Sequence, residues 1–477
     1  MTVTLYYHFC APENDSDRGR GLSRGAFVLL MYFFYRVLTA VGMFLLVPYY
    51  ALRRWRGGEP SRALRERLGS LPPEILFHAG AKRPAESALL RPIWIHAVSV
   101  GEVLAAKPLF EGLKRRFPDR AVFVSTTTET GQRLARERLQ AADGIFYFPL
   151  DWIVPVRRAL RAMRPALVIV METEIWPNFL REARQQNVPV VFANARISGK
   201  SFARYNRWKF LVDGFFARVL QDAELFLAQT PEDAARLDAM GAPEGRVEVT
   251  GNLKYDGEQP DISRFGVWLE DQIRRQERWP VLVAGSVVTQ EEEAVLAAYD
   301  VVQRKWRHAL LVLAPRKPDR FDAAASIAAS SGWNVVRRSR LDLDAPLDEN
   351  ADVLVLDSIG ELAGLYLLAD AVFVGGSLVP AGGHNILEPA WFAKPPVFGV
   401  SMENFRDMAE QFLAAQAGIQ VSSGMQLGKV WVQLIENSAL RDRMGQAALK
   451  LSERNRGAAA RSLDRIGAVL GEQGRPA

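Results

Sequence analysis

The chain has 477 residues, of which 49% are hydrophobic and 24% charged, and its formal net charge at pH 7 is +6. This length predicts two or three domains with sizeable cores. The single cysteine excludes an intramolecular disulfide and a cysteine-based metal site, and five widely spaced histidines disfavour a histidine-rich one, so we expect no metal. No basic run interleaved with aromatic residues indicates binding to nucleic acid. The modest positive charge suits anionic substrates or an anionic membrane surface.

The amino end contains an apolar segment, residues 26–52, that is long enough to cross a bilayer and is flanked by arginines on both sides. No small-residue cleavage site follows it, which disfavours a signal peptide. Three interpretations stay open: a transmembrane helix, an amphipathic or re-entrant anchor whose Arg36 reaches the headgroups, and a core helix of a soluble domain. We assign residues 1–25 to a disordered extension and residues 26–56 to a membrane anchor segment.

Strands and helices alternate along the rest of the chain, after a short helix around residues 62–68. In the first half, strands are predicted over residues 93–100, 121–125, 167–171, 188–193 and 225–228, and helices over 103–117 and 131–140. In the second half, strands are predicted over residues 281–284, 309–313, 334–336, 353–356, 371–374 and 397–398, and helices over 291–305, 360–368 and 387–392.

Such alternation is typical of parallel sheets that are covered by helices on both faces. We therefore predict an α/β protein with two doubly wound, Rossmann-like domains facing a cleft. The first domain spans residues 57–256 and the second spans residues 280–455. The polar segment 257–279 is interpreted as a linker, and residues 456–477 as a C-terminal tail.

Two motifs of the first domain place carboxylates at the ends of predicted strands, where ligands bind in sheets of this kind. In HAVSVGE, residues 96–102, Gly101 is expected to permit a tight turn, and Glu102 lies at a helix start. Glu102 can take a proton from a hydroxyl group, or it can simply cap the helix. In METEIWPN, residues 171–178, Glu172 and Glu174 can bind sugar hydroxyls or orient a base; the alternative is acidity at the start of a helix.

A third motif of the first domain, NARISGKS at residues 194–201, combines cations with hydroxyl groups. Arg196, Ser198 and Lys200 suit a phosphorylated or carboxylated ligand. A solvated cationic loop is the alternative.

The most informative stretch of the chain is GGSLVPAGGHNILEPAWFAKPPVFG, residues 375–399. Its glycines allow positive φ and a close approach to a ligand, and a helix N-terminus attracts anions. A glutamate one turn into that helix can accept hydrogen bonds from a ribose. The pattern is typical of a nucleotide-sugar transferase, and a glycine-rich turn without a ligand is the alternative. The candidate ligand-binding residues here are Gly382, Gly383, His384, Asn385 and Glu388.

Other strand ends of the second domain carry further candidates at the same sheet edge. Ser286 follows the first strand, and Arg316 and Lys317 follow the second. A guanidinium group is a good partner for phosphate. Gly360 and Glu361 follow a later strand, and the Gly360 N–H group could meet a phosphate or a base. Each of these could also be an ordinary loop, but their convergence on one edge favours a binding site.

Taken together, these motifs resemble the 3-deoxy-D-manno-octulosonic acid (Kdo) transferases of lipid A biosynthesis. The resemblance rests on HAVSVGE, METEIWPN, NARISGKS, TGNLKYD, DSIGELAGLY and GGSLVPAGGHNILEPA, which occur in this order, and on the apolar N-terminal segment. It implies a GT-B fold, a CMP-Kdo donor bound mainly by the second domain, and a lipid A precursor (lipid IVA) bound by the first. It also implies inversion at the anomeric centre without metal or cofactor, at the cytoplasmic face of the inner membrane.

The resemblance implies that Glu102 is the catalytic base, and that Arg316, Gly360, Glu361, Asn385 and Glu388 hold the CMP. Around Glu102 we predict a substrate-binding site formed by Ser99, Gly101, Glu172, Glu174, Arg196, Ser198 and Lys200. To the donor site we add Ser286, Lys317, Gly382, Gly383 and His384.

The chain departs from the family pattern at three places. Val287 to Gln290 stand where the family commonly has Thr-His and a glycine before the glutamates, Lys317 replaces a histidine, and Lys200 replaces an arginine. Two alternatives therefore stay open: a GT-B transferase for another nucleotide sugar, and a membrane-tethered nucleotide-binding protein without catalysis.

Overall fold

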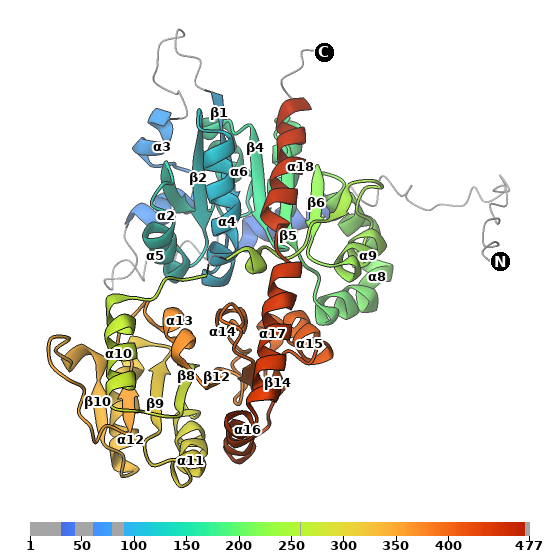
Figure 1. The fold of residues 1–477 in the computed structure, drawn as a ribbon. Coiled ribbons are helices and arrows are strands. Elements are labelled where there is room, and N and C mark those ends of the chain that lie inside the picture. The colour runs from blue at the N-terminus through green and yellow to red at the C-terminus, as the bar shows by residue number, and fades with distance from the viewer. Residues whose placement is uncertain (1–29, 43–60, 79–89, 258, 473–477) are drawn as a thin grey trace, which may run out of the picture. The chain divides into compact units, whose positions relative to one another are not determined.

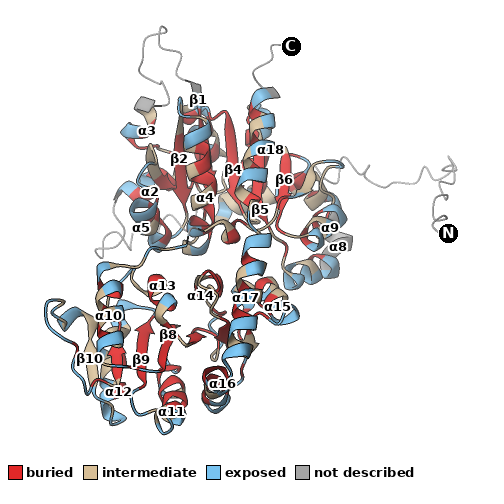
Figure 2. Cartoon of the chain, in the orientation of Figure 1, coloured by how far each residue is buried: buried red, intermediate tan, exposed pale blue. Residues whose placement is uncertain are grey.

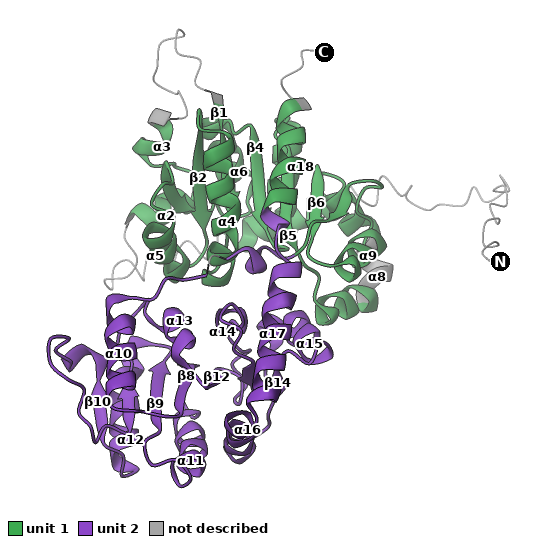
Figure 3. Ribbon diagram, in the orientation of Figure 1, with its two compact units in different colours: residues 1–251, 460–477 green, residues 252–459 purple. Residues whose placement is uncertain are grey.

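The structure is a computed structural model that describes residues 30–42, 61–78, 90–257 and 259–472. These residues form two compact units (Figure 3). Unit 1 comprises Met1–Gly251 together with Ala460–Ala477, and unit 2 comprises Asn252–Ala459. The predicted extension 1–25 and most of the predicted anchor segment 26–56 lie outside the described residues.

Unit 1 contains a parallel seven-stranded sheet with the strand order β3-β2-β1-β4-β5-β6-β7 (Figure 1). Its strands are β1 (Leu90–His96), β2 (Arg120–Thr126), β3 (Gly144–Tyr147), β4 (Leu167–Met171), β5 (Val190–Ala195), β6 (Leu225–Ala228) and β7 (Val247–Val249). Its helices are α2 (Ser61–Arg67), α3 (Pro73–His78), α4 (Val100–Arg116), α5 (Glu129–Arg138), α6 (Ile153–Met163), α7 (Pro177–Gln185), α8 (Gly199–Leu220), α9 (Pro231–Ala239) and most of α18 (Ala458–Glu472).

Unit 2 repeats this architecture with the strand order β10-β11-β9-β8-β12-β13-β14, again all parallel. Its strands are β8 (Val281–Val287), β9 (Leu310–Pro315), β10 (Val335–Arg337), β11 (Val353–Val355), β12 (Ala371–Val374), β13 (Pro396–Phe398) and β14 (Ile419–Gln420). Its α-helices are α10 (Arg264–Arg275), α11 (Glu292–Gln303), α12 (Phe321–Ser330), α13 (Leu362–Leu365), α14 (Leu387–Ala390), α15 (Arg406–Ala414), α16 (Gly424–Glu436) and α17 (Ser438–Arg454).

The central strands are buried on both faces, as Figure 2 shows for each sheet. All five residues of β4, with the sequence LVIVM, are buried, and so are all six of β9. Covered parallel strands read as continuous apolar runs because neither face meets water. The polar loops at the strand ends are therefore the parts of each sheet that remain for binding and chemistry.

The boundaries of the units differ from the predicted domain boundaries. The predicted linker 257–279 contains helix α10, whose Phe265 and Leu269 are fully buried in the core of unit 2. The predicted tail 456–477 contains helix α18, which packs on α4: a Cβ added at Gly112 would lie 2.2 Å from Leu463 Cδ1. Both segments are rich in polar residues, but their apolar residues recur at helical spacing and form one buried stripe.

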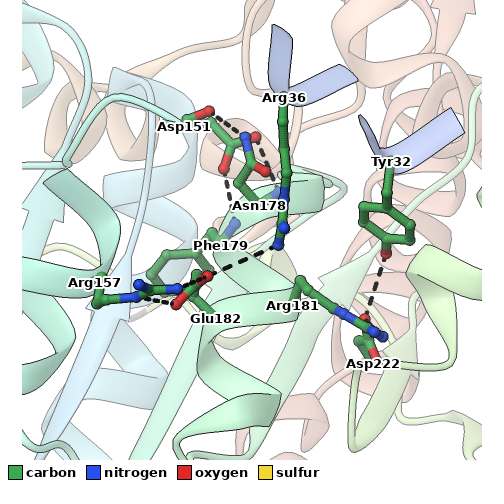
Figure 4. Close-up of polar contacts among 9 residues, drawn as sticks. All are labelled: Tyr32, Arg36, Asp151, Arg157, Asn178, Phe179, Arg181, Glu182 and Asp222. Atoms are coloured by element: carbon green, nitrogen blue, oxygen red, sulfur yellow. Dashed lines mark hydrogen bonds and ion pairs between the residues drawn. The ribbon is translucent and has the colours of Figure 1, made fainter. Parts of the chain in front are cut away.

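Residues 30–42 form a helix that is attached to unit 1 by polar side chains (Figure 4). Three polar pairs contribute to this attachment, beside ring contacts of both tyrosines with Phe215: Tyr32 Oη donates to Asp222 Oδ2 (3.4 Å), Tyr35 Oη donates to Asp151 Oδ2 (2.7 Å), and Arg36 Nη2 lies 3.9 Å from Glu182 Oε1. Arg36 is therefore directed at a buried carboxylate of α7, whereas the anchor interpretation expected it to reach lipid headgroups. Among the described helices, none has the length and apolar content to cross a membrane.

The opposite side of this helix is apolar and exposed. Its exposed large hydrophobic residues are Leu30, Phe33, Phe34, Val37, Leu38 and Val41, which we call the outer stripe. These positions recur at the three- and four-residue spacing of one helical face. The helix thus packs Tyr32 and Tyr35 against unit 1 and leaves a second apolar face exposed, whereas a surface helix usually exposes polar residues.

Candidate active site

The carboxyl ends of β1, β4 and β5 bring the predicted acceptor residues of unit 1 to one edge of the sheet. β1 and β4 pair in register, with His96 opposite Val170, and β4 pairs with β5, with Met171 opposite Ala193. Glu102 lies at the start of the helix after β1, Glu172 and Glu174 lie in the loop after β4, and Arg196 follows β5. The parallel topology therefore places the three predicted motifs side by side at this edge.

Glu102 lies in the first turn of α4, and its side chain is turned back onto the preceding loop. It is buried, with 7% of its surface exposed. Its Oε2 accepts a hydrogen bond from the Val98 N–H group (2.8 Å), and its Oε1 accepts one from Ser99 Oγ (3.0 Å). The carboxylate thus satisfies a backbone donor at the helix start while it stays next to the edge where a ligand would bind.

Three acidic side chains influence one another at this edge. Burial is the main cause that raises the pKa of Glu102 to about 8, and the charges of Glu172 and Glu174 act in the same direction. Hydrogen bonds from Val98 and Ser99 act in the opposite direction. Burial and then Glu172 also raise the pKa of Glu174. A carboxylate with such a pKa is an unusually strong base, as proton abstraction from a hydroxyl requires.

The METEIWPN motif forms the loop after β4 and the start of α7. Pro177 is the first residue of α7, a favourable position for proline. Neither Glu172 nor Glu174 caps this helix; instead Asp151 accepts the N–H groups of Asn178 (3.2 Å) and Phe179 (2.8 Å). The charges of both glutamates act on Glu102, so the two lie near it at the sheet edge, and their role in binding stays a prediction.

Gly101 occupies a different environment from the tight turn that the sequence suggested. It is the second residue of α4, and it is not among the glycines with positive φ. A Cβ added there would meet only Ser99 Oγ, at 4.0 Å. The glycine therefore leaves open space above the first turn of α4 beside Glu102.

The NARISGKS motif contributes mainly backbone structure. Ser198 is the N-cap of α8, and its Oγ accepts the Ser201 N–H group at 3.1 Å. The Arg196 N–H group donates to Thr173 Oγ1 (3.3 Å), which ties this loop to the loop after β4. Lys200 is exposed in the first turn of α8. Ligand binding by Arg196, Ser198 and Lys200 stays a prediction.

His96, at the end of β1, was not singled out from the sequence. It is fully buried, its ring stacks on Phe148 with centroids 3.8 Å apart, and its Nδ1 lies 3.0 Å from Ser125 Oγ. Burial lowers its pKa to about 3, so the imidazole is neutral at physiological pH. In the sequence it was only the first residue of the HAVSVGE motif, with no separate signal of its burial.

In unit 2, the loops of the 375–399 stretch have the positive φ angles that its glycines suggested. Gly376, Gly382 and Gly383 have φ of 67°, 88° and 76°. However, the N–H group of Gly382 donates to Ser401 Oγ (3.0 Å), and that of Gly383 donates to the Gly376 carbonyl (2.7 Å). These donors are thus satisfied within the protein. The following helix, α14, has only four residues, so its N-terminus provides little of the expected helix dipole.

Three titratable side chains, Arg316, His384 and Glu388, lie close together at this edge. Burial raises the pKa of Glu388 to about 7, although the charge of Arg316 and a hydrogen bond from Asn385 Nδ2 (3.5 Å) oppose the shift. Burial, followed by the Arg316 charge, lowers the pKa of His384 to about 4. One exposed guanidinium therefore acts on both side chains, as a donor site with a phosphate and a ribose would need.

The remaining predicted donor residues are spread along the edge. Ser286 adopts the left-handed conformation (φ 56°) near the end of β8, and Lys317 is exposed after β9. Gly360 has a φ of 92° and open space around its Cα. The carboxylate of Glu361 is engaged by Arg338, with Nε and Nη2 at 3.0 and 3.2 Å. Glu361 therefore already has a cationic partner inside unit 2.

Comparison with known proteins identifies the family. A family model described as 3-deoxy-D-manno-octulosonic-acid transferase (kdotransferase) matches residues 62–257. The 3-deoxy-D-manno-octulosonic acid transferase of Haemophilus influenzae is 33% identical over 437 residues, which cover 91% of this chain and 97% of the relative. The chain belongs to the Kdo transferase family. The Bordetella pertussis member is 33% identical over 422 residues, covering 84% of this chain and 92% of the relative. The resemblance drawn from the motifs is thereby confirmed, and membership makes the protein a glycosyltransferase.

Solved structures support the fold of this Kdo transferase family member. The UDP-GlcNAc 2-epimerase of Neisseria meningitidis, solved with UDP-GlcNAc, gives a TM-score of 0.52 at 15% identity, covering 79% of this chain and 99% of that one. At this identity the likeness concerns the fold alone. Two parallel seven-stranded α/β units agree with the predicted GT-B architecture.

Proposed function

We propose that this protein transfers Kdo from CMP-Kdo to a lipid A precursor, lipid IVA, with inversion at the anomeric carbon. The observation that carries the proposal is the buried carboxylate of Glu102, with its pKa raised to about 8, at the sheet edge of a Kdo transferase family member. A base of this strength suits removal of a proton from a sugar hydroxyl, which a glutamate of ordinary pKa does poorly.

In the proposed reaction, the acceptor hydroxyl oxygen attacks the anomeric carbon of Kdo as Glu102 takes its proton. The bond between that carbon and the phosphate oxygen breaks on the opposite face, and CMP leaves with the electron pair. Negative charge grows on the leaving phosphate, and Arg316, an exposed cation at the donor edge, stabilises it. Glu388 would accept hydrogen bonds from the ribose. Proton transfer and charge stabilisation are thus assigned to side chains, without a cofactor or metal.

The direct test is an assay with CMP-Kdo and a tetraacylated lipid A precursor, with products read by mass spectrometry. A mass increase of one or more Kdo units supports the proposal. A parallel panel of other nucleotide sugars separates it from a transferase with a different donor. CMP binding without any transfer would instead support the non-catalytic alternative.

The raised pKa of Glu102 predicts the pH dependence of transfer. The base must be ionised, so kcat/KM should rise with pH and level off above the pKa of about 8. Ser99→Ala removes a hydrogen bond that lowers this pKa, so its profile should move to higher pH. Rates measured from pH 6 to 9.5 in both proteins provide the check; a wild-type profile that is flat above pH 6 would contradict it.

We also propose that the outer stripe holds the protein on the cytoplasmic face of the inner membrane, where an anionic lipid surface is its partner. The helix exposes six large apolar side chains on one face, where an ordinary surface helix exposes polar residues. The polar pairs to Asp151, Glu182 and Asp222 favour a helix that lies along the protein, with its outer stripe in the interface.

The membrane proposal predicts a strong effect of charge on the outer stripe. In the double variant Phe34→Glu, Leu38→Glu, binding to vesicles that contain phosphatidylglycerol should weaken by about 100-fold or more, since each side chain contributes about 1.5–3 kcal/mol when buried. Val267→Glu is the matched control, because Val267 is an exposed hydrophobic residue of α10 in unit 2. Vesicle flotation measures the effect. Undiminished flotation of the double variant would show that this face does not bind lipid.

A further inference from the structure

We propose that Glu291 is a positioning residue for donor binding: its carboxylate holds the first loop of the 375–399 stretch in shape. Glu291 is the N-cap residue of α11 and is fully buried. Its Oε2 accepts the Gly376 N–H group at 2.6 Å, and its Oε1 accepts those of Ser377 and Leu378 at 2.8 Å each. Three consecutive backbone donors thus converge on one carboxylate, more than 80 residues away in the sequence.

These donors form the kind of concave backbone site, often called a nest, that binds phosphate in other proteins. Here a side chain of the protein itself already occupies it. Hydrogen bonds between backbone N–H groups and an ionised carboxylate are short and strong, and the positive φ of Gly376 (67°) lets its N–H group join the set. The glycine pair at residues 375–376 therefore serves an internal anion, and the donor phosphate must find its partners elsewhere along the edge.

The same carboxylate also fixes the end of β8. Its Oε2 accepts the Val288 N–H group (3.1 Å), and the neighbouring Val287 carbonyl accepts the N–H group of Arg316 (2.8 Å). The two loops are packed so closely that a Cβ added at Gly375 would lie 2.7 Å from Val287 Cα. Glu291 thus joins the loop after β12 to the turn that holds the backbone of Arg316.

The connection continues to His384, one of the three titratable side chains of the donor edge. The Gly376 carbonyl accepts the N–H group of Gly383 (2.7 Å), and a Cβ added at Gly376 would lie 2.7 Å from the His384 ring. His384 therefore rests directly on the residue that Glu291 holds. Displacement of this loop should move His384 and the backbone around Arg316 together, so the carboxylate acts on the donor through them.

Glutamine at residue 291 keeps the shape but not the hydrogen-bonding pattern. One of its two polar atoms is an NH₂ group, which would face N–H donors that now meet an oxygen, so at least one donor loses its partner. Glu291→Asp keeps the charge on a side chain that is one methylene shorter. Glu292 and Glu293 offer matched controls: Glu292 is also buried but pairs with Arg320 (2.7 Å), and Glu293 is exposed.

The test compares Glu291→Gln, Glu291→Asp, Glu292→Gln and Glu293→Gln by CMP affinity, donor KM, thermal midpoint and backbone hydrogen exchange. We expect Glu291→Gln to weaken CMP binding and raise the donor KM by about tenfold or more, and to speed exchange over residues 376–383. Glu291→Asp should recover part of both effects. Glu292→Gln should lower the thermal midpoint but leave the donor KM within twofold, and Glu293→Gln should change neither.

This inference rests on the proposed function, and the readouts separate the two. A wild type that binds CMP but transfers no Kdo would contradict the proposed function alone, and CMP affinities of the variants would then decide the role of Glu291. Unchanged CMP affinity and exchange in Glu291→Gln would overturn the inference, and so would an equal loss of affinity in Glu292→Gln. A wild type without affinity for CMP would overturn both.

Discussion

Replacing Glu102 by glutamine is expected to lower kcat for Kdo transfer by about 10²- to 10⁴-fold, the usual cost of losing a general base. Glutamine preserves the size of the side chain, and its oxygen can still accept the Val98 N–H group that Glu102 binds at 2.8 Å. The start of α4 should therefore remain intact. What is lost is the ability to take the proton of the attacking hydroxyl.

Two controls show whether Glu102→Gln affects only the proton transfer. CMP affinity, measured by calorimetry, should remain within about twofold, because Glu102 belongs to unit 1 and the predicted CMP ligands belong to unit 2. Glu129→Gln, an exposed glutamate at the start of α5, should keep wild-type activity. Activity of Glu102→Gln within a few-fold of the wild type would rule out Glu102 as the base.

The stability of Glu102→Gln should also change in a definite direction. Because the pKa of Glu102 in the folded protein is raised from 4.5 to about 8, ionisation of this group opposes folding as the pH rises through that window. The glutamine variant should therefore be at least as thermally stable as the wild type at pH 8.5, and the difference should shrink toward pH 5. A loss of activity together with lower stability would point to misfolding instead.

Replacing Glu388 by alanine is expected to weaken CMP binding by about 10- to 100-fold, the range expected when a hydrogen bond to a charged group is lost. The carboxylate lies near Arg316 at the donor edge and has a hydrogen bond from Asn385 Nδ2 at 3.5 Å. At 3.5 Å this hydrogen bond is at the limit of the accepted range, so a ribose hydroxyl at an ordinary distance would bind the carboxylate more strongly.

Calorimetry at pH 8, above the pKa of about 7 for Glu388, gives the fairest comparison, because the wild-type carboxylate is then mostly ionised. The thermal midpoint should not fall, since burial makes the ionised form costly to keep in the fold. Glu410→Ala, an exposed site on α15, is the control for removing a glutamate from unit 2. Equal CMP affinities in wild type and Glu388→Ala would remove Glu388 from the donor site.

The central strands could be predicted from the sequence because each of them is a continuous apolar run. β4 and β9 lie inside covered parallel sheets, so every residue is apolar and the run is visible without any alignment. The strands that were missed, β3, β7 and β14, lie at or near sheet edges, and they are short and only partly buried. Each of them pairs with the strand directly before it in the chain, but a strand of two to four residues is too short to show a recognisable apolar pattern.

The candidate site residues likewise divide into those whose position followed from the sequence and those whose position did not. Strand order alone brings Glu102, Glu172 and Glu174 together, so their convergence followed from recognising a parallel sheet. The partners of the backbone donors in the 375–399 stretch did not follow, because Glu291 is far away in the sequence and resembled an ordinary helix start. The N-terminal segment shows a third case: its composition indicated a membrane, but only the structure shows which side faces Asp222 and which side is exposed.

The return of helix α18 to unit 1 has a consequence for synthesis of the protein. Unit 2 is inserted between Gly251 and Ala460, so the ribosome must finish an entire second sheet before the last helix of the first unit exists. Until then α4 lacks the helix that covers Gly112 and supplies Asp464 to Arg116 at 2.5 Å. Folding of unit 1 therefore cannot be completed until unit 2 has been synthesised. A chain released before residue 460 would leave α4 uncovered around Gly112. Chaperones and proteases could recognise this exposed surface in an incomplete molecule.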